Sequence, residues 1–447
     1  MDLAYMAAMP QEEFAERRHR VFQQMQEDAV LIVFSEIEKR RSNDCTYPFR
    51  QDSYFWYLTG FNEPNSVLIL AKHGQTTESI IFVRPSDPLR ETWDGRRLGV
   101  ANAPQKLQLD RAFSIEDFHT ELPKILAKST ALYHVNALHP WGDALLVEND
   151  INLETTLCWK GMLDEMRLFK SDNEIALMQQ AGQISALAHI RAMQKTRPNR
   201  LEYEIEGELL HEFNRFGARF PSYNAIVAGG ENACILHYTE NDMPLKDGDL
   251  VLIDAGCEFA MYAGDITRTF PVNGKFSQAQ REIYDIVLKA QKRAIELLVP
   301  GNSIQQANDE VVRIKVEGLV KLGILQGDVE TLIQNETYRQ FYMHGLGHWL
   351  GLDVHDVGSY SKDQQNNNRN SKVRDRPLEV GMVLTVEPGL YISEQADVPE
   401  QYKGIGIRIE DNLLITEYGN KNLTSAVPKE IDEIEKLMAG NKGSFYA

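Results

Sequence analysis

The sequence lacks the features that mark secreted, membrane-spanning or disulfide-rich proteins. Its four cysteines, Cys45, Cys158, Cys234 and Cys257, are far apart and form no CxxC pair. This usage argues against a disulfide framework or a cysteine-zinc site and is typical of a reducing compartment. No basic residue precedes Arg17, whereas a secretory signal begins with basic residues, and no apolar run approaches the roughly 18 residues of a membrane helix. We therefore expect a cytoplasmic protein.

Basic charge is also scarce. The 447 residues include 47 Lys and Arg against 65 Asp and Glu, which gives a net charge of −18 at pH 7. Such an acidic surface argues against a nucleic-acid backbone or an anionic membrane as the main partner. Hydrophobic residues make up 43% of the chain and charged residues 25%. These are ordinary globular proportions, and the length suggests two or three domains.

The apolar pattern divides the chain into two predicted domains. In the first part, an amphipathic helical pattern and short β-rich runs alternate, which is typical of an α/β domain, and no phosphate-binding GxGxxG or GxxxxGK loop occurs. The second part is predicted to be α+β, with helices that begin at capping-box patterns. We place the domains at residues 1–170 and 171–440. The predicted elements are a helix at 10–26, strands at 29–34, 66–70 and 79–83, helices from Ser171, Ser277 and Ser303, and strands at 250–258, 265–272, 382–387 and 405–416.

Four acidic residues accompany hydrophobic strand segments of the second domain. Asp254 follows the run LVLI, Asp265 opens the segment DITRT, Glu387 follows VLTV, and Glu410 ends IGIRIE. A carboxylate on a buried strand is costly unless it is paired or binds a cation. A single acid of this kind is easily explained as a turn cap, but four in one domain are not.

Three histidines lie within twelve positions on a glycine-rich backbone. His344 and His348 belong to HGLGHWLG, and His355 follows in VHDVG. Glycine allows the backbone to approach a ligand closely. His237, in CILHY, is a weaker candidate.

Four carboxylates with one imidazole form an oxygen-rich ligand set. Hard divalent cations such as Mn²⁺ suit this set, whereas structural zinc prefers cysteine and histidine. Two divalent ions would balance four carboxylates, and paired metals are a known hydrolytic device. No Ser-His-Asp order or reactive-cysteine context competes with this interpretation.

These motifs resemble those of the "pita-bread" metallopeptidases, which include methionine aminopeptidase, prolidase and aminopeptidase P. The resemblance is strongest to the bacterial aminopeptidase P (Xaa-Pro aminopeptidase) family and covers nearly the whole chain. In the first domain it includes YPFRQDSYFWYLTGFNEP at 47–64 and WDGRRLG at 93–99. In the second it includes the segments around the four acids and His348.

The resemblance implies a fold and a role for each site residue. The fold is an α/β N-terminal domain with a mixed sheet, followed by an α+β pita-bread catalytic domain of pseudo-twofold symmetry. The implied metal ligands are Asp254, Asp265, His348, Glu387 and Glu410, of which Asp265 and Glu410 bridge both ions. The implied catalytic residues are Glu387 as general base and then acid, with His355 and His237 contacting substrate or the intermediate. His344, Tyr360 and Tyr391 would line or support the pocket. Arg408, two residues before Glu410, would share its strand face and orient or screen that carboxylate.

The implied activity is hydrolysis of the N-terminal Xaa-Pro peptide bond through a metal-bridging hydroxide. The substrates would be peptides with proline at the second position. The cofactors would be two divalent ions, with Mn²⁺ as the expected metal. The chain would assemble as a homodimer or homotetramer. The alternative is a prolidase, which cuts only dipeptides, because the metal-ligand motifs do not distinguish a prolidase from an aminopeptidase P. A non-catalytic pita-bread binding protein and a creatinase-like metal-free hydrolase are disfavoured because all five ligands are present.

A polar segment at 361–376, SKDQQNNNRNSKVRDR, is longer than the connection usual in this family. It is locally basic in an acidic protein, and both of its ends lie close in sequence to predicted site residues. We expect either a solvated surface insertion or a rim element that attracts the carboxylate end of short peptides. Salt would screen the second effect.

Overall fold

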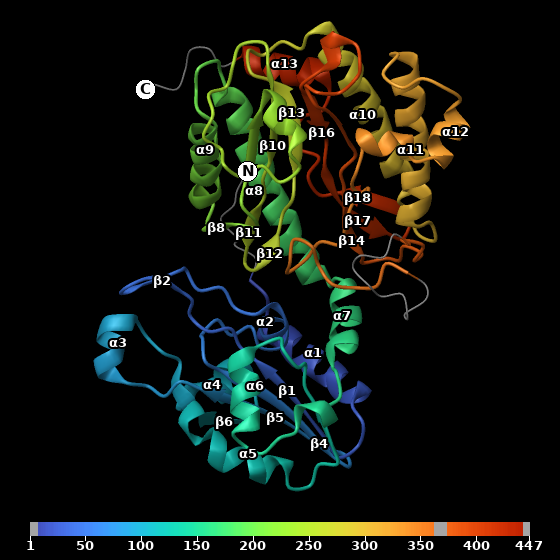
Figure 1. Cartoon of the computed structure of the whole chain (residues 1–447). Coiled ribbons are helices and arrows are strands. Elements are labelled where there is room, and N and C mark those ends of the chain that lie inside the picture. The colour runs from blue at the N-terminus through green and yellow to red at the C-terminus, as the bar shows by residue number, and fades with distance from the viewer. Residues whose placement is uncertain (1–7, 362–372, 441–447) are drawn as a thin grey trace. The chain divides into compact units, whose positions relative to one another are not determined.

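The computed structural model describes residues 8–361 and 373–440 (Figure 1), so most of the polar segment at 361–376 lies outside the described residues. The chain forms two compact units, which divide between Met166 and Arg167. Helix α7 (Lys160–Leu168) crosses this division. The finer limits of 1–170 and 171–440 stay a prediction.

The N-terminal unit is built on a five-stranded mixed sheet in the order β6-β5-β4-β1-β7. Neighbours β1, β4 and β5 are antiparallel, whereas β6 and β7 join the two edges in parallel. The predicted strand at 29–34 and the predicted helix at 10–26 are both present. The strands are β1 (Ala29–Phe34), β2 (Arg40–Ser42), β3 (Cys45–Thr46), β4 (Val67–His73), β5 (Thr76–Val83), β6 (Arg111–Ser114) and β7 (Ala131–Tyr133). The helices are α1 (Gln11–Gln24), α2 (Ser53–Thr59), α3 (Pro88–Asp94), α4 (Gly99–Leu107), α5 (Phe118–Leu126) and α6 (Pro140–Val147).

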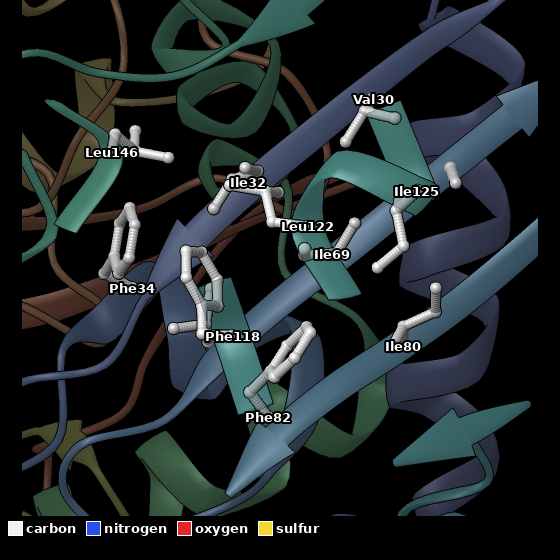
Figure 2. Close-up of a cluster of buried hydrophobic side chains, with 12 residues drawn as sticks. Val30, Ile32, Phe34, Ile69, Ile80, Phe82, Phe118, Leu122, Ile125 and Leu146 are labelled. Carbon is white, nitrogen blue, oxygen red and sulfur yellow. The ribbon is translucent and has the colours of Figure 1, made fainter. Parts of the chain in front are cut away.

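One face of this sheet packs against α5 and α6. Alternate side chains of β1, including Val30, Ile32 and Phe34, point to the same face, because successive side chains of a strand point to opposite faces. They meet Phe118 and Leu122 of α5 in a buried cluster (Figure 2). Each such side chain contributes about 1.5–3 kcal/mol when removed from water. The continuous apolar run of β1 arises because both faces of the strand are buried.

The second unit repeats one arrangement twice: a pair of contacting helices followed by short antiparallel strands. The first half has α8 (Asp172–Lys195), α9 (Glu202–Arg215), β8 (Phe220–Pro221), β9 (Ile226–Gly229), β10 (Leu250–Asp254), β11 (Cys257–Phe259), β12 (Tyr262–Ala263) and β13 (Thr267–Pro271). The second half has α10 (Gln278–Leu297), α11 (Ile304–Lys321), α12 (Val329–Gln334), β14 (Val383–Val386), β15 (Gly389–Ile392), β16 (Ile405–Arg408), β17 (Asp411–Thr416), β18 (Gly419–Asn422) and α13 (Ile431–Ala439). Strands β10 and β13 contact β16, so the strands of the two halves meet between the helix pairs (Figure 1).

The helix starts follow the sequence closely. Ser171, Ser277 and Ser303 each accept a hydrogen bond from the third amide of the helix, while the Glu or Gln at that position returns a bond to the serine amide. These capping boxes satisfy amides that have no partner inside the helix. The three predicted helix starts are confirmed. None of the helices in the described ranges is long and apolar enough to cross a membrane.

Candidate metal centre and active site

Asp254 and Asp265 come together through a short excursion of the chain between β10 and β13. The two strands are antiparallel, with Asp254 opposite Thr267. Gly256 and Gly264 cross so closely that a β-carbon on Gly256 would collide with the Gly264 backbone. This close approach returns the chain to the end of β10 and places the second aspartate beside the first.

Glu387 and Glu410 come together through the pairing of β14 with β17, in which Val386 lies opposite Asp411. Glu387 follows the first strand and Glu410 precedes the second, so both carboxylates leave the same end of the pair. Glu410 also binds the first half of the unit: its amide donates to Thr267 O at 3.0 Å, and Thr267 Oγ1 donates to Glu410 Oε2 at 2.6 Å. All four acids therefore converge where the halves meet.

His348 is oriented by its own neighbours. Its Nδ1 donates to the carbonyl of Trp349 at 3.0 Å, since a carbonyl can only accept, and its amide donates to Thr385 Oγ1 at 3.1 Å. Nε2 consequently faces the acids, 3.4 Å from Asp265 Oδ2 and 3.5 Å from Glu387 Oε1. A histidine held by one nitrogen with the other presented is the usual arrangement of a metal ligand.

Asp254 lies on a strand, as expected, because it is the last residue of β10. The same expectation is wrong for the other three acids: Asp265 precedes β13, Glu387 follows β14, and Glu410 stands between β16 and β17. The predicted strands at 250–258 and 405–416 are each broken into two. The physical reason is convergence: within a strand the side chains alternate between faces, whereas strand ends allow the backbone to turn all four carboxylates toward one point.

Crowding and burial make these acids hard to ionise without a cation. Burial and the neighbouring Asp254 raise the pKa of Asp265 well above its ordinary range. Burial and Asp265 do the same to the pKa of Glu410, and burial with Glu410 raises the pKa of Glu387 to about 8.

A divalent cation would remove this penalty. Ligand atoms of Asp265, His348 and Glu410 all lie within 4.8 Å of one another, so among the described residues this set could hold a metal ion. The oxygen-rich donor set fits a hard divalent ion.

Arg408 connects the acids to His344. Its Nη2 donates to Asp254 Oδ2 at 2.6 Å, and its Nη1 donates to the hydroxyl oxygen of Tyr391 at 3.0 Å. The predicted shared strand face with Glu410 is corrected: β16 ends at Arg408, and the hydrogen bond goes to Asp254 instead. The guanidinium charge still lowers the pKa of Glu410 against the stronger effect of burial.

His344 is held as a neutral imidazole. Its Nδ1 donates to the Gly345 carbonyl at 2.8 Å, and its Nε2 lies 2.8 Å from the Tyr391 hydroxyl. Burial lowers its pKa to about 3, and the charges of Arg408 and Lys315 act in the same direction. A neutral ring with a proton on Nδ1 must accept at Nε2, so Tyr391 donates to His344.

A cavity of about 500 Å³ opens over the acids. Of the eleven predicted site residues, ten line it and Tyr391 stands behind His344. His355 is solvent-exposed and its ring stacks on His348, with centroids 3.8 Å apart and planes 14° apart. His237 is also exposed at the cavity wall.

Sequence reasoning missed Tyr223. Its hydroxyl lies 2.5 Å from Asp254 Oδ1 and 2.6 Å from Asp265 Oδ1, so it joins the two aspartates. The segment FPSYN carries no periodic or motif signal that would single out this tyrosine. Arg374, considered only as a charge of the polar segment, donates to Gly347 O at 2.5 Å and lies over the Tyr360 ring, within the cavity lining.

Comparison with known proteins agrees with this geometry. The model of metallopeptidase family M24 matches residues 176–417, and that of the aminopeptidase P N-terminal domain matches residues 14–133. The chain is 74% identical to the Xaa-Pro aminopeptidase of Haemophilus influenzae, over 98% of this chain and 100% of that protein. It is 53% identical to the Xaa-Pro aminopeptidase of Escherichia coli, over 97% and 99% of the two chains. The solved structure of zinc-substituted Escherichia coli aminopeptidase P with product superimposes with a TM-score of 0.93 at 52% identity, and covers 98% of this chain and 100% of that one. The expected fold, an α/β N-terminal domain with a pita-bread catalytic domain, is confirmed.

Proposed function

The chain belongs to metallopeptidase family M24, and on that premise we propose that it is an Xaa-Pro aminopeptidase, a dinuclear metal-dependent hydrolase of N-terminal Xaa-Pro bonds. One observation carries the proposal: four acids and an imidazole from both halves of the catalytic unit converge on one cavity. The named relatives match over nearly the full length of this chain, the N-terminal domain included.

The metal ligands in this proposal are the five residues that the sequence motifs indicate. By the family resemblance, Asp265 and Glu410 would bridge two ions. The pKa of each is raised well above its ordinary range by burial and neighbouring acids, an effect that a cation would reverse. Asp254 would complete one site, and His348 and Glu387 the other. When bound, two ions such as Mn²⁺ would activate the attacking water and polarise the scissile carbonyl.

The protein's own groups would supply proton transfer and orientation. The Glu387 carboxylate reaches the cavity beside His348, where it can take a proton from the nucleophile and return it to the leaving amine. His355 and His237 line the same cavity and can donate hydrogen bonds to the oxygen that develops negative charge. His344 and Tyr360 bound the pocket, and Arg408 and Tyr391 hold Asp254 and His344 in place.

The first prediction concerns the metal. Chelation should abolish activity and Mn²⁺ should restore it. Asp265→Asn and Glu410→Gln should lose the most, because each would remove a bridging ligand. The measurement is turnover with metal analysis before and after chelation, and full activity of the metal-free enzyme would refute the dinuclear mechanism. Tyr418→Ser, at a surface residue that is 92% exposed, is the control and should respond to chelation like the unmodified enzyme.

The second prediction concerns the substrate. Proline has no amide hydrogen and a fixed φ, so we expect release of the first residue only when proline is second and the N-terminal amine is free. The assay compares an Xaa-Pro tripeptide, the matching Xaa-Ala tripeptide and an Xaa-Pro dipeptide. Equal rates on the two tripeptides would contradict the proposal, and cleavage of the dipeptide alone would indicate the prolidase alternative.

Assembly and location also remain part of the proposal. We propose a homodimer or homotetramer formed through the N-terminal domains, supported by the apolar side chains exposed on α3. A cytoplasmic location is supported by four free cysteines, of which Cys45 and Cys158 are exposed.

A further inference from the structure

A buried ion network lies under the loop that carries His355. The carboxylate of Asp356 accepts hydrogen bonds from Arg167 Nη2 at 2.6 Å and from Lys170 Nζ at 3.0 Å. All three side chains are 1% exposed. A buried ion pair is stable only with good geometry, and apolar residues often serve stability equally well. Two cations directed at one carboxylate therefore point to a positional role.

The network holds the loop on both sides of His355. Arg167 Nη2 also donates to Asp353 Oδ2 at 2.8 Å, so one guanidinium binds acids two residues before and one residue after His355. The Asp356 amide donates to Trp349 O at 2.9 Å and closes the loop. Gly351 completes the packing, because a β-carbon there would collide with the Asp356 carboxylate and press on Lys170.

The backbone of the segment that carries Arg167 and Lys170 is also held in place by a hydrogen bond. Lys170 N donates to Gly381 O at 2.9 Å, at the turn that leads into β14. The segment from Arg167 to Lys170 is thus tied to the strand preceding Glu387 as well as to the His355 loop. Its two cationic side chains are placed by elements that also place the candidate metal ligands.

We propose that Arg167 and Lys170 are positioning residues for His355: by holding Asp353 and Asp356 they keep its imidazole over the cavity, stacked on His348. His355 is exposed, and its ring stacks on His348 with the ring centroids 3.8 Å apart. The inference rests on the proposed function, which gives His355 its role toward the substrate.

The test uses the metal-loaded, full-length enzyme and Lys170→Met, which keeps the apolar stem and removes the charge. We expect unchanged metal content, a fall in kcat of about tenfold or more, and a KM changed by less than about twofold. Losses of this size are usual for groups that orient a site residue without contacting the metal or the substrate. Lys170→Arg should recover most of the kcat, which simple filling of space would not explain.

Arg281→Met is the matched control. Glu435 is also a buried carboxylate held by two cations, Lys275 Nζ at 2.7 Å and Arg281 Nη2 at 2.6 Å, but it belongs to α13, away from the cavity. Loss of the Arg281 charge should reduce the stability of the protein and leave kcat unchanged. An equal fall in kcat for Arg281→Met and Lys170→Met would overturn the positioning role.

A crystal structure of Lys170→Met gives a readout that needs no turnover. We expect the His355 ring to leave its stack on His348, and a ring in its original place would overturn the inference. If Lys170→Met does not fold, Asp353→Asn is the second variant. It removes the Arg167–Asp353 ion pair at a side chain that is 38% exposed, so it should disturb folding less. The same kcat, KM and ring-position criteria apply to it. Failure of the unmodified enzyme to cleave Xaa-Pro peptides would refute the proposed function, while the crystal structure would still decide the positioning.

Discussion

Lys315 is a lysine in surroundings that do not suit a charge. It lies on α11, is 1% exposed, and its Nζ stands 2.8 Å from the centroid of the Tyr342 ring. Within the described part of the chain its ammonium has no hydrogen-bond partner. Burial lowers its pKa well below the ordinary 10.5, although the charge of Glu387 acts in the opposite direction. The cation–π contact offsets only part of the cost of burying the charge.

We therefore predict that Lys315→Met stabilises the protein. At pH 7 the gain should be about 1–3 kcal/mol, or a rise in Tm of about 2–6 °C. The gain should shrink with rising pH. The pKa of Lys315 is lower in the folded protein than in the unfolded chain, where it is about 10.5. Between these two pKa values the unfolded chain binds more protons, so the unmodified protein gains stability as pH rises. The advantage of the methionine variant therefore decreases.

Thermal unfolding of both proteins at pH 7 and near pH 10 measures this gain. Lys321→Met, on the same helix, is the control, because Lys321 is exposed and its replacement should change Tm little. A lower Tm for Lys315→Met at pH 7, or a gain that does not depend on pH, would contradict the prediction.

At the scale of elements, the close crossing of Gly256 and Gly264 brings the two aspartates together. The amide of Gly264 donates to Cys257 O at 2.9 Å, which joins the two sides of the excursion between β10 and β13. A β-carbon on Gly256 would overlap backbone atoms, which cannot rotate away as a flexible side chain can. Separation of the two segments would move Asp265 away from Asp254.

We predict that Gly256→Ala lowers stability by about 1–3 kcal/mol, the usual cost of overpacking, and weakens Mn²⁺ binding by roughly tenfold or more. Calorimetric titration of metal into chelated enzyme and thermal unfolding measure the two effects. Gly207→Ala is the control: Gly207 lies on α9 with open space where a β-carbon would stand, so this change should raise Tm slightly. Equal metal affinity for both variants would contradict the prediction.

The sequence predicted those elements whose signals are local. The capping boxes at Ser171, Ser277 and Ser303 satisfy amides a few residues away, and the apolar run at 29–34 is a complete buried strand. The strand breaks after Asp254 and Arg408 were not predicted. They depend on pairing between distant segments, and a run of apolar residues does not show where a strand partner ends.

The candidate site was predicted mainly from its motifs, and the contacts that join the motifs were not. All five predicted metal-ligand residues line one cavity, but Tyr223 has no local signal, and its position between Asp254 and Asp265 comes from the tertiary fold. The same holds for Arg167 and Lys170, which meet Asp356 across more than 180 positions of sequence. Long-range polar contacts of this kind leave no periodic trace.

For the whole molecule, the N-terminal unit carries an apolar surface that its own fold does not cover. Helix α3 has no buried residue, and its Leu89 and Trp93 are 75% and 83% exposed. Large side chains exposed on a short helix at the end of a loop are costly in water, and such patches commonly mark contacts between proteins. Arginine, tryptophan and tyrosine are also enriched at the centres of interfaces; Arg90 lies on this helix, and Arg96 and Arg97 follow it. The patch therefore fits an interface between copies of the chain.

We predict that the protein sediments as a dimer or tetramer at micromolar concentration, and that Leu89→Ser with Trp93→Ser shifts it toward the 50.9 kDa monomer. The double variant should fold normally, because neither side chain belongs to the core, and normal folding is checked by its Tm. Tyr418→Ser is the matched control: Tyr418 is 92% exposed, but it lies in the catalytic unit between β17 and β18. This change should leave the sedimentation coefficient unchanged. A 50.9 kDa species alone for the unmodified protein would refute the assembly, and an oligomer that persists in the double variant would place the interface elsewhere.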